Sequence, residues 1–344
     1  MRSIEELQAL SRLDPELGQL IENGLQLPPA WTKETDIHAV RAVFAQLAAA
    51  DTPPSHIAEE DHQITMRDKA KIRVRVYRLR NTTSRPGEDV GRPGMMMLHG
   101  GGFCVGGLES GTRLCRFFAE RLGGVAVNVE YRLAPEFAFP IPVSDTYDGL
   151  EWVARSVGDL GIDPAKGFLV AGESAGADLA LAAAYLWVEE GNTPPLTGLY
   201  CAANSAASLD TVPEQYMSKF ISMQECADAP VMSAEAAEFI KSIYKPDSHS
   251  PLAYPIGVSD LSVMPKTYFQ ACGLDPFRDC TLVMEQVWRD AGVPTRLDIY
   301  AGMPHVFWVL GLSVEQAKKH EMEAEKGFRW LLSRPGPLKR ETHD

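Results

Sequence analysis

Six short apolar runs recur from the second quarter of the chain onward, and they limit its fold more than any other feature. They read MMMLH, VAVNVEY, FLVAGES, LTGLYCA, TYFQACG and RLDIYAG. Runs of this length and composition are typical of strands that are buried on both faces of a sheet. Helix-like stretches of roughly ten to twenty residues separate most of the runs. The alternation predicts an α/β fold in which helices cover both sides of a mainly parallel sheet.

The segments outside these runs have different patterns. Leucines recur at helical spacing within the first twenty residues, and the stretch DIHAVRAVFAQLAAA also predicts a helix. The stretch KIRVRVYRL alternates charged and apolar residues, which indicates a half-buried antiparallel strand. No strand pattern occurs between Ala206 and Met264, where a helical patch, SAEAAEFIKSIY, stands among methionines and aromatic residues. We expect this interval to be an insertion that packs over one end of the sheet.

Charge and cysteine usage exclude several classes of protein. The chain of 344 residues has a net charge of −13, which disfavours nucleic acid and anionic membranes as partners. Its six cysteines lack the spacing of a zinc site, and a core this large does not need disulfides. The N-terminus has glutamates where a signal peptide would be apolar, and the longest apolar run, 179–188, is too short to span a bilayer. We therefore expect a cytoplasmic protein without a metal, a cofactor or a stable membrane association.

One serine lies between two glycines where a predicted strand meets a predicted helix. The residues Gly172-Glu173-Ser174-Ala175-Gly176 match the pattern G-x-S-x-G. A serine on such a turn sits in strained backbone, and the glycines let neighbouring segments approach closely. The start of the following helix has free amides and a partial positive charge, which suits a developing oxyanion. The pattern predicts that Ser174 is a nucleophile; the alternative is a tight structural turn.

A glycine-rich loop follows the first apolar run. His99-Gly100-Gly101-Gly102 can turn backbone amides into a pocket, because glycine adopts the conformations that this requires. We expect the amides of Gly101, Gly102 and Ala175 to form an oxyanion hole, although a merely flexible turn is the alternative. His99 lies at the strand end, where it is better placed to anchor the glycine loop than to act on Ser174.

The remaining members of a serine triad are expected in the order serine, acid, histidine. Asp275 lies just past the run TYFQACG, and His305 lies just past the run RLDIYAG. Both residues should therefore reach the same edge of the sheet as Ser174. Asp275 would orient His305, and His305 would act as the base. Asp279 is a second candidate for the acid, but Asp275 is nearer to the strand end.

These motifs resemble those of the hormone-sensitive-lipase-type esterases of the α/β-hydrolase superfamily, and most of all its fungal biosynthetic branch. The matching stretches are HGGGFCVGGLES, VNVEYRLAPE, GESAGADLA, YFQACGLDPFRD and YAGMPHVFW. The resemblance implies an eight-stranded sheet and a helical cap. It divides the chain into N-terminal cap helices (1–50), a first catalytic part (51–206), a cap insertion (207–255) and a second catalytic part (256–344). It assigns the triad and the oxyanion hole to Ser174, Asp275 and His305, and to Gly101, Gly102 and Ala175.

Several positions depart from the family pattern. Glu173 stands where relatives often have aspartate or threonine, and its carboxylate could hold the glycine loop or the histidine loop, or simply be solvated. Val306 follows the catalytic histidine where glycine is common, and its bulk could narrow the pocket. Ala177-Asp178 replaces the usual Gly-Asn, and the sequence offers no account of that change.

The resemblance implies a serine carboxylesterase that hydrolyses short-to-medium acyl esters of small molecules, in secondary metabolism, without a cofactor. It leaves open whether the chain forms a homodimer. One alternative is a trans-acting thioesterase or acyltransferase of a polyketide pathway, because the same acyl-enzyme can be attacked by another nucleophile. The other is a binding protein on this fold, but the related receptors have lost the catalytic histidine and this chain has His305. Apolar faces at 216–223 and 239–244 could line the substrate pocket or pack on the sheet.

Overall fold

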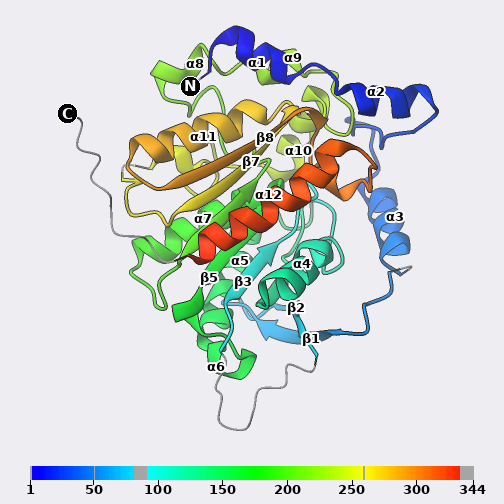
Figure 1. Cartoon of the computed structure of the whole chain (residues 1–344). Helices are drawn as coiled ribbons and strands as arrows, with labels where there is room; N and C mark the ends of the chain where they lie inside the picture. The colour runs from blue at the N-terminus through cyan, green and yellow to red at the C-terminus, as the bar shows by residue number, and fades with distance from the viewer. Residues whose placement is uncertain (1, 50, 81–90, 259, 334–344) are drawn as a thin grey trace.

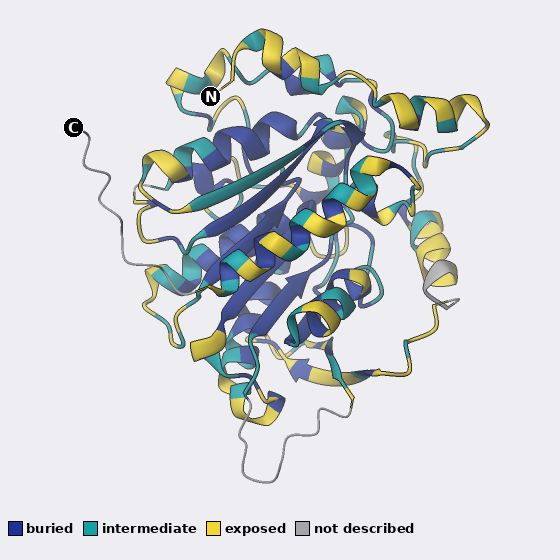
Figure 2. Ribbon diagram, in the orientation of Figure 1, coloured by how far each residue is buried: buried dark blue, intermediate teal, exposed yellow. Residues whose placement is uncertain are grey.

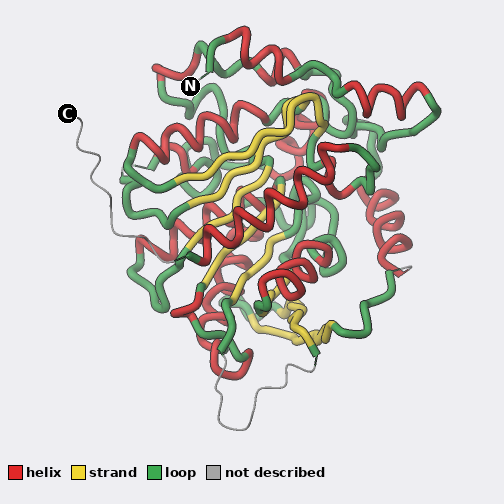
Figure 3. Tube along the Cα trace, viewed as in Figure 1, coloured by secondary structure: helices red, strands yellow, loops and turns green. Residues whose placement is uncertain are grey.

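The computed structural model describes residues 2–49, 51–80, 91–258 and 260–333. Its described residues contain one eight-stranded sheet in the order β1-β2-β4-β3-β5-β6-β7-β8 (Figures 1 and 3). The first two strands pair antiparallel with their neighbours, and the others are parallel. The strands are β1 (Ile57–Thr65), β2 (Lys71–Leu79), β3 (Gly94–Leu98), β4 (Val125–Val129), β5 (Phe168–Glu173), β6 (Gly198–Ala202), β7 (Thr267–Leu274) and β8 (Thr295–Pro304).

Helices cover both faces of this sheet. Apolar residues of α5, α7 and α11 pack on one face, and those of α4 and α12 pack on the other, in front of the sheet in Figure 1. The helices are α1 (Ile4–Leu10), α2 (Pro15–Glu22), α3 (Ile37–Ala49), α4 (Thr112–Leu122), α5 (Ile141–Arg155), α6 (Val157–Leu160), α7 (Ala175–Glu189), α8 (Glu214–Met217), α9 (Ser222–Glu225), α10 (Ala234–Tyr244), α11 (Arg278–Asp290) and α12 (Glu315–Leu332).

The apolar runs form strands because both of their faces are covered. In β3, Met95 and Met97 pack into the core on one side of the sheet, while Met96 and Leu98 pack into the core on the other. All residues of β3 and β5 are buried, and Figure 2 shows the centre of the sheet as buried beneath the partly exposed α12. The prediction of a mainly parallel sheet between two layers of helices is confirmed.

Of the two antiparallel strands, the sequence pattern predicted one and missed the other. The alternating stretch KIRVRVYRL forms β2, which pairs with β1 and β4 and buries alternate residues through its first half. The pattern did not identify β1, whose sequence is IAEEDHQIT. The central residues of β1 are exposed because it is the edge strand of the sheet, and an edge strand needs no apolar run.

The leucine-rich start of the chain packs on the far edge of the sheet. Leu7 of α1 forms a small apolar cluster with Ala271 of β7 and Leu282 of α11, and Ile221 of the insertion packs against that cluster. Figure 1 shows α1 and α9 together at the top of the molecule, above α11. The leucine stripe therefore covers the sheet and α11 as well as the insertion.

The carboxyl ends of four parallel strands carry the residues of the predicted site. His99 follows β3, Ser174 follows β5, Asp275 follows β7 and His305 follows β8. Strands β3 and β5 are neighbours, as are β7 and β8. The glycine loop is therefore placed beside Ser174, and Asp275 beside His305.

Candidate active site

The turn at Ser174 depends on close contacts that only glycine permits on either side. Ser174 has a φ of 54° and a ψ of −127°, a strained conformation for a residue with a side chain. A Cβ atom on Gly172 would lie 2.0 Å from the carbonyl oxygen of Gly176, and one on Gly176 would lie 2.0 Å from that of Leu98. The two glycines thus allow the end of β5, the start of α7 and the end of β3 to pack closely together. This packing places Ser174 at the edge of the sheet.

Ser174, His305 and Asp275 form one chain of hydrogen-bonding contacts. Ser174 Oγ lies 2.7 Å from His305 Nε2, and His305 Nδ1 lies 2.7 Å from Asp275 Oδ2. The three residues are 8%, 2% and 0% exposed, so the contacts are shielded from water. The other carboxylate oxygen of Asp275 accepts a hydrogen bond from the Phe277 amide, and the Phe277 ring meets the imidazole edge to face. The carboxylate and the imidazole are therefore each held from two sides.

The predicted oxyanion donors lie beside the serine. A Cβ atom on Gly100 would lie 3.2 Å from the Cβ atom of Ser174, which places the glycine loop against the turn. Within the described residues, the amides of Gly101, Gly102 and Ala175 have no protein acceptor. Such free amides next to a serine can bind a developing oxyanion.

His99 contacts the glycine loop and Tyr131. Its Nδ1 lies 2.7 Å from the carbonyl oxygen of Gly100, and its ring stacks on Tyr131 at 4.4 Å. The side chain is fully buried, and this burial lowers the pKa of His99 to about 4. The interpretation of His99 as an anchor is therefore supported by its contacts.

The second candidate acid faces away from the histidine. Oδ2 of Asp279 accepts hydrogen bonds from the amides of Ile221 and Ser222 in the insertion, both at 2.7 Å. Oδ1 accepts a hydrogen bond from the buried guanidinium of Arg278 at 2.7 Å. Arg278 also donates to Glu225 and to the carbonyl oxygen of Leu7. Asp279 thus links the start of α11 to the insertion directly, and to α1 through Arg278.

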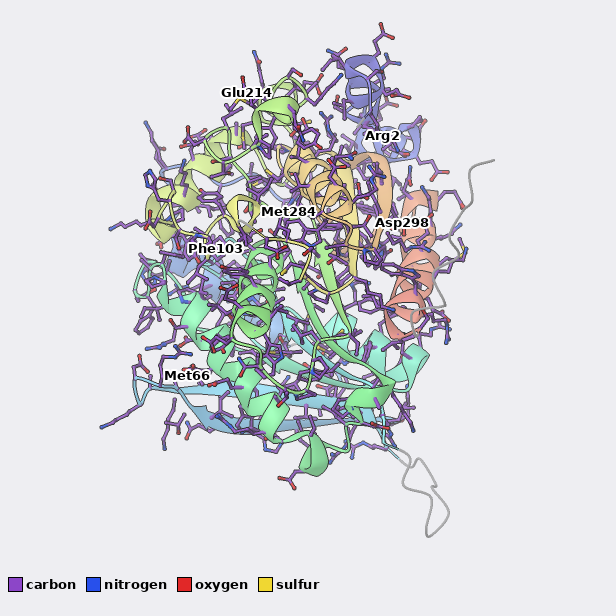
Figure 4. The ribbon with its side chains drawn as sticks, turned by 90° about the vertical axis from the view of Figure 1, so that its left-hand side faces the viewer. Arg2, Met66, Phe103, Glu214, Met284 and Asp298 are labelled. Atoms are coloured by element: carbon purple, nitrogen blue, oxygen red, sulfur yellow. The ribbon has the colours of Figure 1, made fainter. Side chains whose placement is uncertain are left out.

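Two segments that are distant in sequence cover the glycine loop. A Cβ atom on Gly102 would lie 2.9 Å from Ile240 of α10 and 3.1 Å from the ring of Trp31. The Phe103 ring stacks on Tyr244 of α10 at 3.7 Å, and Figure 4 shows Phe103 beneath the yellow-green insertion. The helical pattern of 234–244 indicated α10, but no pattern singled out Trp31. Which side chains of a helical cap reach a loop depends on the tertiary packing.

Glu173 joins the serine turn to the histidine loop. It is 5% exposed and accepts a hydrogen bond from Trp308 Nε1 at 2.8 Å, three residues after His305. Arg113 lies 3.6 Å from the same oxygen. Burial raises the pKa of the Glu173 carboxyl, and the Arg113 guanidinium opposes this rise. Of the interpretations open at the sequence level, contact with the histidine loop agrees with the structure and solvation does not.

Val306 departs from the family pattern at a position where the backbone favours glycine. Its φ is 44° and its ψ is 38°, in the left-handed region. A β-branched residue is strongly disfavoured in that region, whereas glycine is not. The side chain packs against the core formed with α4 and α12. The preference for glycine here has a backbone cause, and this chain keeps valine at the cost of strain.

Asp178, of the Ala177-Asp178 departure, is a buried carboxylate that contacts Ser205. It lies in the first turn of α7 and is 8% exposed. Its carboxylate accepts hydrogen bonds from the amide and the hydroxyl of Ser205, at 2.8 and 2.5 Å. Burial raises the pKa of Asp178 from 3.8 to about 7, although the hydrogen bonds from Ser205 oppose the rise. The folded protein therefore holds a proton here over a pH range in which the unfolded chain would release it.

We expect the substitution Asp178→Asn to stabilise the protein at high pH and much less at low pH. Because the folded pKa exceeds the unfolded one, the wild type loses stability as pH rises from about 4 to about 7. The neutral amide avoids this loss and can keep both contacts with Ser205. The difference in the free energy of unfolding should grow to at most roughly 4 kcal/mol above pH 7. Urea unfolding at several pH values measures it.

The matched control for this prediction is Glu189→Gln, which changes an exposed carboxylate on the same helix. Its stability difference from the wild type should change little with pH. A difference for Asp178→Asn that stayed constant from pH 4.5 to pH 8 would show that Asp178 is not a buried acid with a raised pKa.

The part of the chain that the structure describes holds neither a metal cluster nor a helix that could span a membrane. No group of three or more His, Cys, Asp or Glu side chains there could hold a metal ion. The six cysteines are all buried and free. No described helix is both long and apolar enough to cross a membrane.

Comparisons with known proteins identify a matching family and several similar chains. A family model described as alpha/beta hydrolase fold matches residues 95–309. An AB hydrolase superfamily protein of Schizosaccharomyces pombe is 34% identical, over 95% of this chain and 96% of its own length. Versiconal hemiacetal acetate esterase of Dothistroma septosporum is 33% identical, over 86% and 88%. Among solved structures, vibralactone cyclase superposes with a TM-score of 0.83 at 31% identity, over 94% of this chain and 96% of its own.

Proposed function

Because the chain belongs to the alpha/beta hydrolase fold family and is a carboxylesterase, we propose that Ser174, His305 and Asp275 hydrolyse its ester substrate. The observation that carries the proposal is the buried chain of contacts from Ser174 Oγ through His305 to Asp275, with 2.7 Å at each step. A nucleophile within hydrogen-bond reach of a base, which is itself oriented by an acid, is the arrangement that activates a serine hydroxyl.

The proposed reaction has two steps that use the same groups. Ser174 Oγ attacks the ester carbonyl while His305 Nε2 takes its proton, and Asp275 stabilises the resulting imidazolium. The amides of Gly101, Gly102 and Ala175 bind the negative oxygen of the tetrahedral intermediate. His305 then protonates the departing alkoxide, which leaves an acyl-enzyme on Ser174. Water activated by His305 attacks this acyl group and releases the carboxylic acid.

The surroundings of the site support short-to-medium acyl chains. Trp31 and Ile240 lie against Gly102, and Phe277 lies against His305, so apolar groups surround the reacting atoms. Ser174 is only 8% exposed, which restricts access for bulky groups. We assign Trp31 and Ile240 to a cap made of residues 1–50 and 207–255, and Phe277 to a catalytic domain made of residues 51–206 and 256–344.

The similarity to a versiconal hemiacetal acetate esterase supports an acetate-type ester as a substrate. The resemblance to fungal biosynthetic esterases supports a place for the reaction in secondary metabolism. The proposed substrate is thus a small apolar molecule that carries a short ester group.

The test combines turnover with covalent labelling. p-Nitrophenyl esters from acetate to octanoate measure hydrolysis and its chain-length preference, which should favour the shorter chains. A phosphonate that carries a p-nitrophenyl leaving group should label Ser174, as peptide mass spectrometry would show. When an alcohol is added, it competes with water for the acyl-enzyme. The ratio of carboxylic acid to new ester in the products then distinguishes hydrolysis from acyl transfer. Turnover of the esters without labelling at Ser174 would contradict the proposed nucleophile, and binding without turnover would favour a receptor.

A further inference from the structure

The glycine loop has a backbone conformation that must be held in place. Gly101, Gly102 and Phe103 have successive positive φ angles of 121°, 59° and 60°. Glycine adopts such angles freely, but phenylalanine does not. Strained backbone of this kind persists only where the surrounding contacts fix it. The contacts of this loop therefore decide where its amides point.

The carbonyl oxygens of the loop are engaged one after another. Those at the start of the loop are held by its own residues, since the amides of Cys104 and Val105 donate to Gly101 and the Cys104 thiol donates to Gly102. Phe103 is held from outside, because its carbonyl oxygen accepts a hydrogen bond from the Ala134 amide at 2.9 Å. The carbonyl oxygens of Gly101, Gly102 and Phe103 are thus engaged, whereas the amides of Gly101 and Gly102 have no acceptor among the described residues.

The last carbonyl of the loop is held by a charged side chain from the N-terminal segment. Arg41 of α3 donates from Nε to the carbonyl oxygen of Cys104 at 2.7 Å. Its Nη2 donates to the carbonyl oxygen of Ala134, also at 2.7 Å. Ala134 is also the residue whose amide donates to the carbonyl oxygen of Phe103. One guanidinium therefore binds both of the segments that this backbone hydrogen bond joins. Glu136 pairs with Arg41 through two bonds of 2.8 Å. The Arg41 side chain is 25% exposed, so water screens these bonds only in part.

We propose that Arg41 is a positioning residue for the oxyanion hole. It holds the backbone from Gly101 to Cys104, so that the amides of Gly101 and Gly102 reach the substrate oxygen at Ser174. This inference rests on the proposed function, because it needs an oxyanion at that place. Oxyanion donors act only within a narrow range of distance, about 2.7 to 3.1 Å. A small shift of the loop therefore weakens binding of the transition state more than binding of the ester.

The substitution Arg41→Ala tests this role. We expect kcat for p-nitrophenyl acetate to fall roughly 10- to 100-fold, less than when an oxyanion donor is removed outright. KM should stay within about two-fold, because the loss affects the transition state and not the bound ester. An alkylboronic acid, which forms a tetrahedral adduct with an activated serine, should show a Ki that rises in parallel with the loss of kcat/KM. A merely structural role would lower the unfolding temperature without this parallel change.

Two variants complete the design. Arg73→Ala is the matched control: Arg73 of β2 pairs with Glu130 through two bonds of 2.7 and 2.6 Å, and in the described chain it makes no hydrogen bond to the glycine loop. This control should keep the wild-type kcat and Ki. Arg41→Gln keeps part of the side-chain stem and one donor group, and it replaces Arg41→Ala if that variant does not fold. It should lose most of the same activity, because one amide cannot span both carbonyl oxygens.

The outcomes separate this inference from the proposed function. A folded Arg41 variant with the wild-type kcat and boronic acid Ki would overturn the inference, as would a change confined to KM. If the wild type neither hydrolysed the ester nor bound the boronic acid, the proposed function itself would fail. If the wild type and the Arg41 variant hydrolysed the ester and bound the boronic acid equally well, the proposed triad would stand and only the role of Arg41 would be rejected.

Discussion

Ser174→Ala should abolish ester hydrolysis in a protein that still folds. The substitution removes the hydroxyl that contacts His305 Nε2, at 2.7 Å, and leaves the Cβ atom and the turn around it. The remaining oxyanion donors cannot replace a nucleophile, so kcat should fall by roughly 10,000-fold to a million-fold, as for other serine triads. Hydrolysis of p-nitrophenyl acetate measures the activity, and phosphonate labelling shows whether the nucleophile is present. Circular dichroism shows whether the variant is folded.

The stability of this variant is part of the prediction. Alanine and serine differ by one atom, and the backbone amide of residue 174 donates to Ala202 in either case. The unfolding temperature should therefore lie close to that of the wild type. Near-normal turnover by a folded variant would remove Ser174 from the mechanism, whereas a loss of turnover together with the fold would call for Ser174→Cys as a second variant.

Asp275→Asn should lose activity but keep its fold, whereas Asp279→Asn should lose stability but keep most of its activity. Asp275 contacts His305 Nδ1 at 2.7 Å, and an amide there can hold the imidazole in the wrong tautomer. We expect kcat to fall roughly 10,000-fold while the protein remains folded. Asp279 contacts the buried Arg278 and two amides of the insertion, so its loss leaves a buried cation with fewer partners. We expect this variant to lose about 3 to 5 kcal/mol of stability.

The two readouts must be measured separately to distinguish these acids. Urea unfolding gives the free energy of unfolding, and kcat measured well below the unfolding midpoint gives the activity of the folded protein. Asp279→Asn should keep most of that activity. A larger loss of kcat in Asp279→Asn than in Asp275→Asn would reverse the assignment of the acid.

The sequence predicted the parts of this site that depend on strand ends. Ser174, Asp275 and His305 each follow an apolar run, and in a parallel sheet the carboxyl ends of the runs meet at one edge. Their proximity could therefore be predicted without knowing any side-chain contact. The same reasoning favoured Asp275 over Asp279, because Asp275 is nearer to the strand end. In the structure, Asp279 lies in α11 and contacts the insertion.

The contacts that hold the site could not be predicted in this way. Trp308 reaches Glu173 across 135 positions in sequence, and Arg41 reaches Cys104 across 63. Arg41 is one of 33 basic residues, and nothing in its local pattern separates it from the others. The length and direction of a side chain after packing decide such contacts. Strand β1 was missed for a related reason, since its exposed position at the edge of the sheet removes the apolar signal.

The ties from the N-terminal segment have a consequence for how this protein changes over evolutionary time. Arg41 binds the carbonyl oxygens of Cys104 and Ala134, and Arg278 binds that of Leu7. Every amino acid supplies such an oxygen, so mutation of the accepting residue does not remove the acceptor. Correlated substitution arises where two side chains must match each other, and here only one side of each pair is a side chain. Arg41 and Arg278 can still covary with their carboxylate partners, such as Glu136 and Glu225. We therefore expect no covariation between these arginines and positions 104, 134 and 7. The contacts that link the N-terminal segment to the rest of the fold would then stay hidden from coevolutionary analysis.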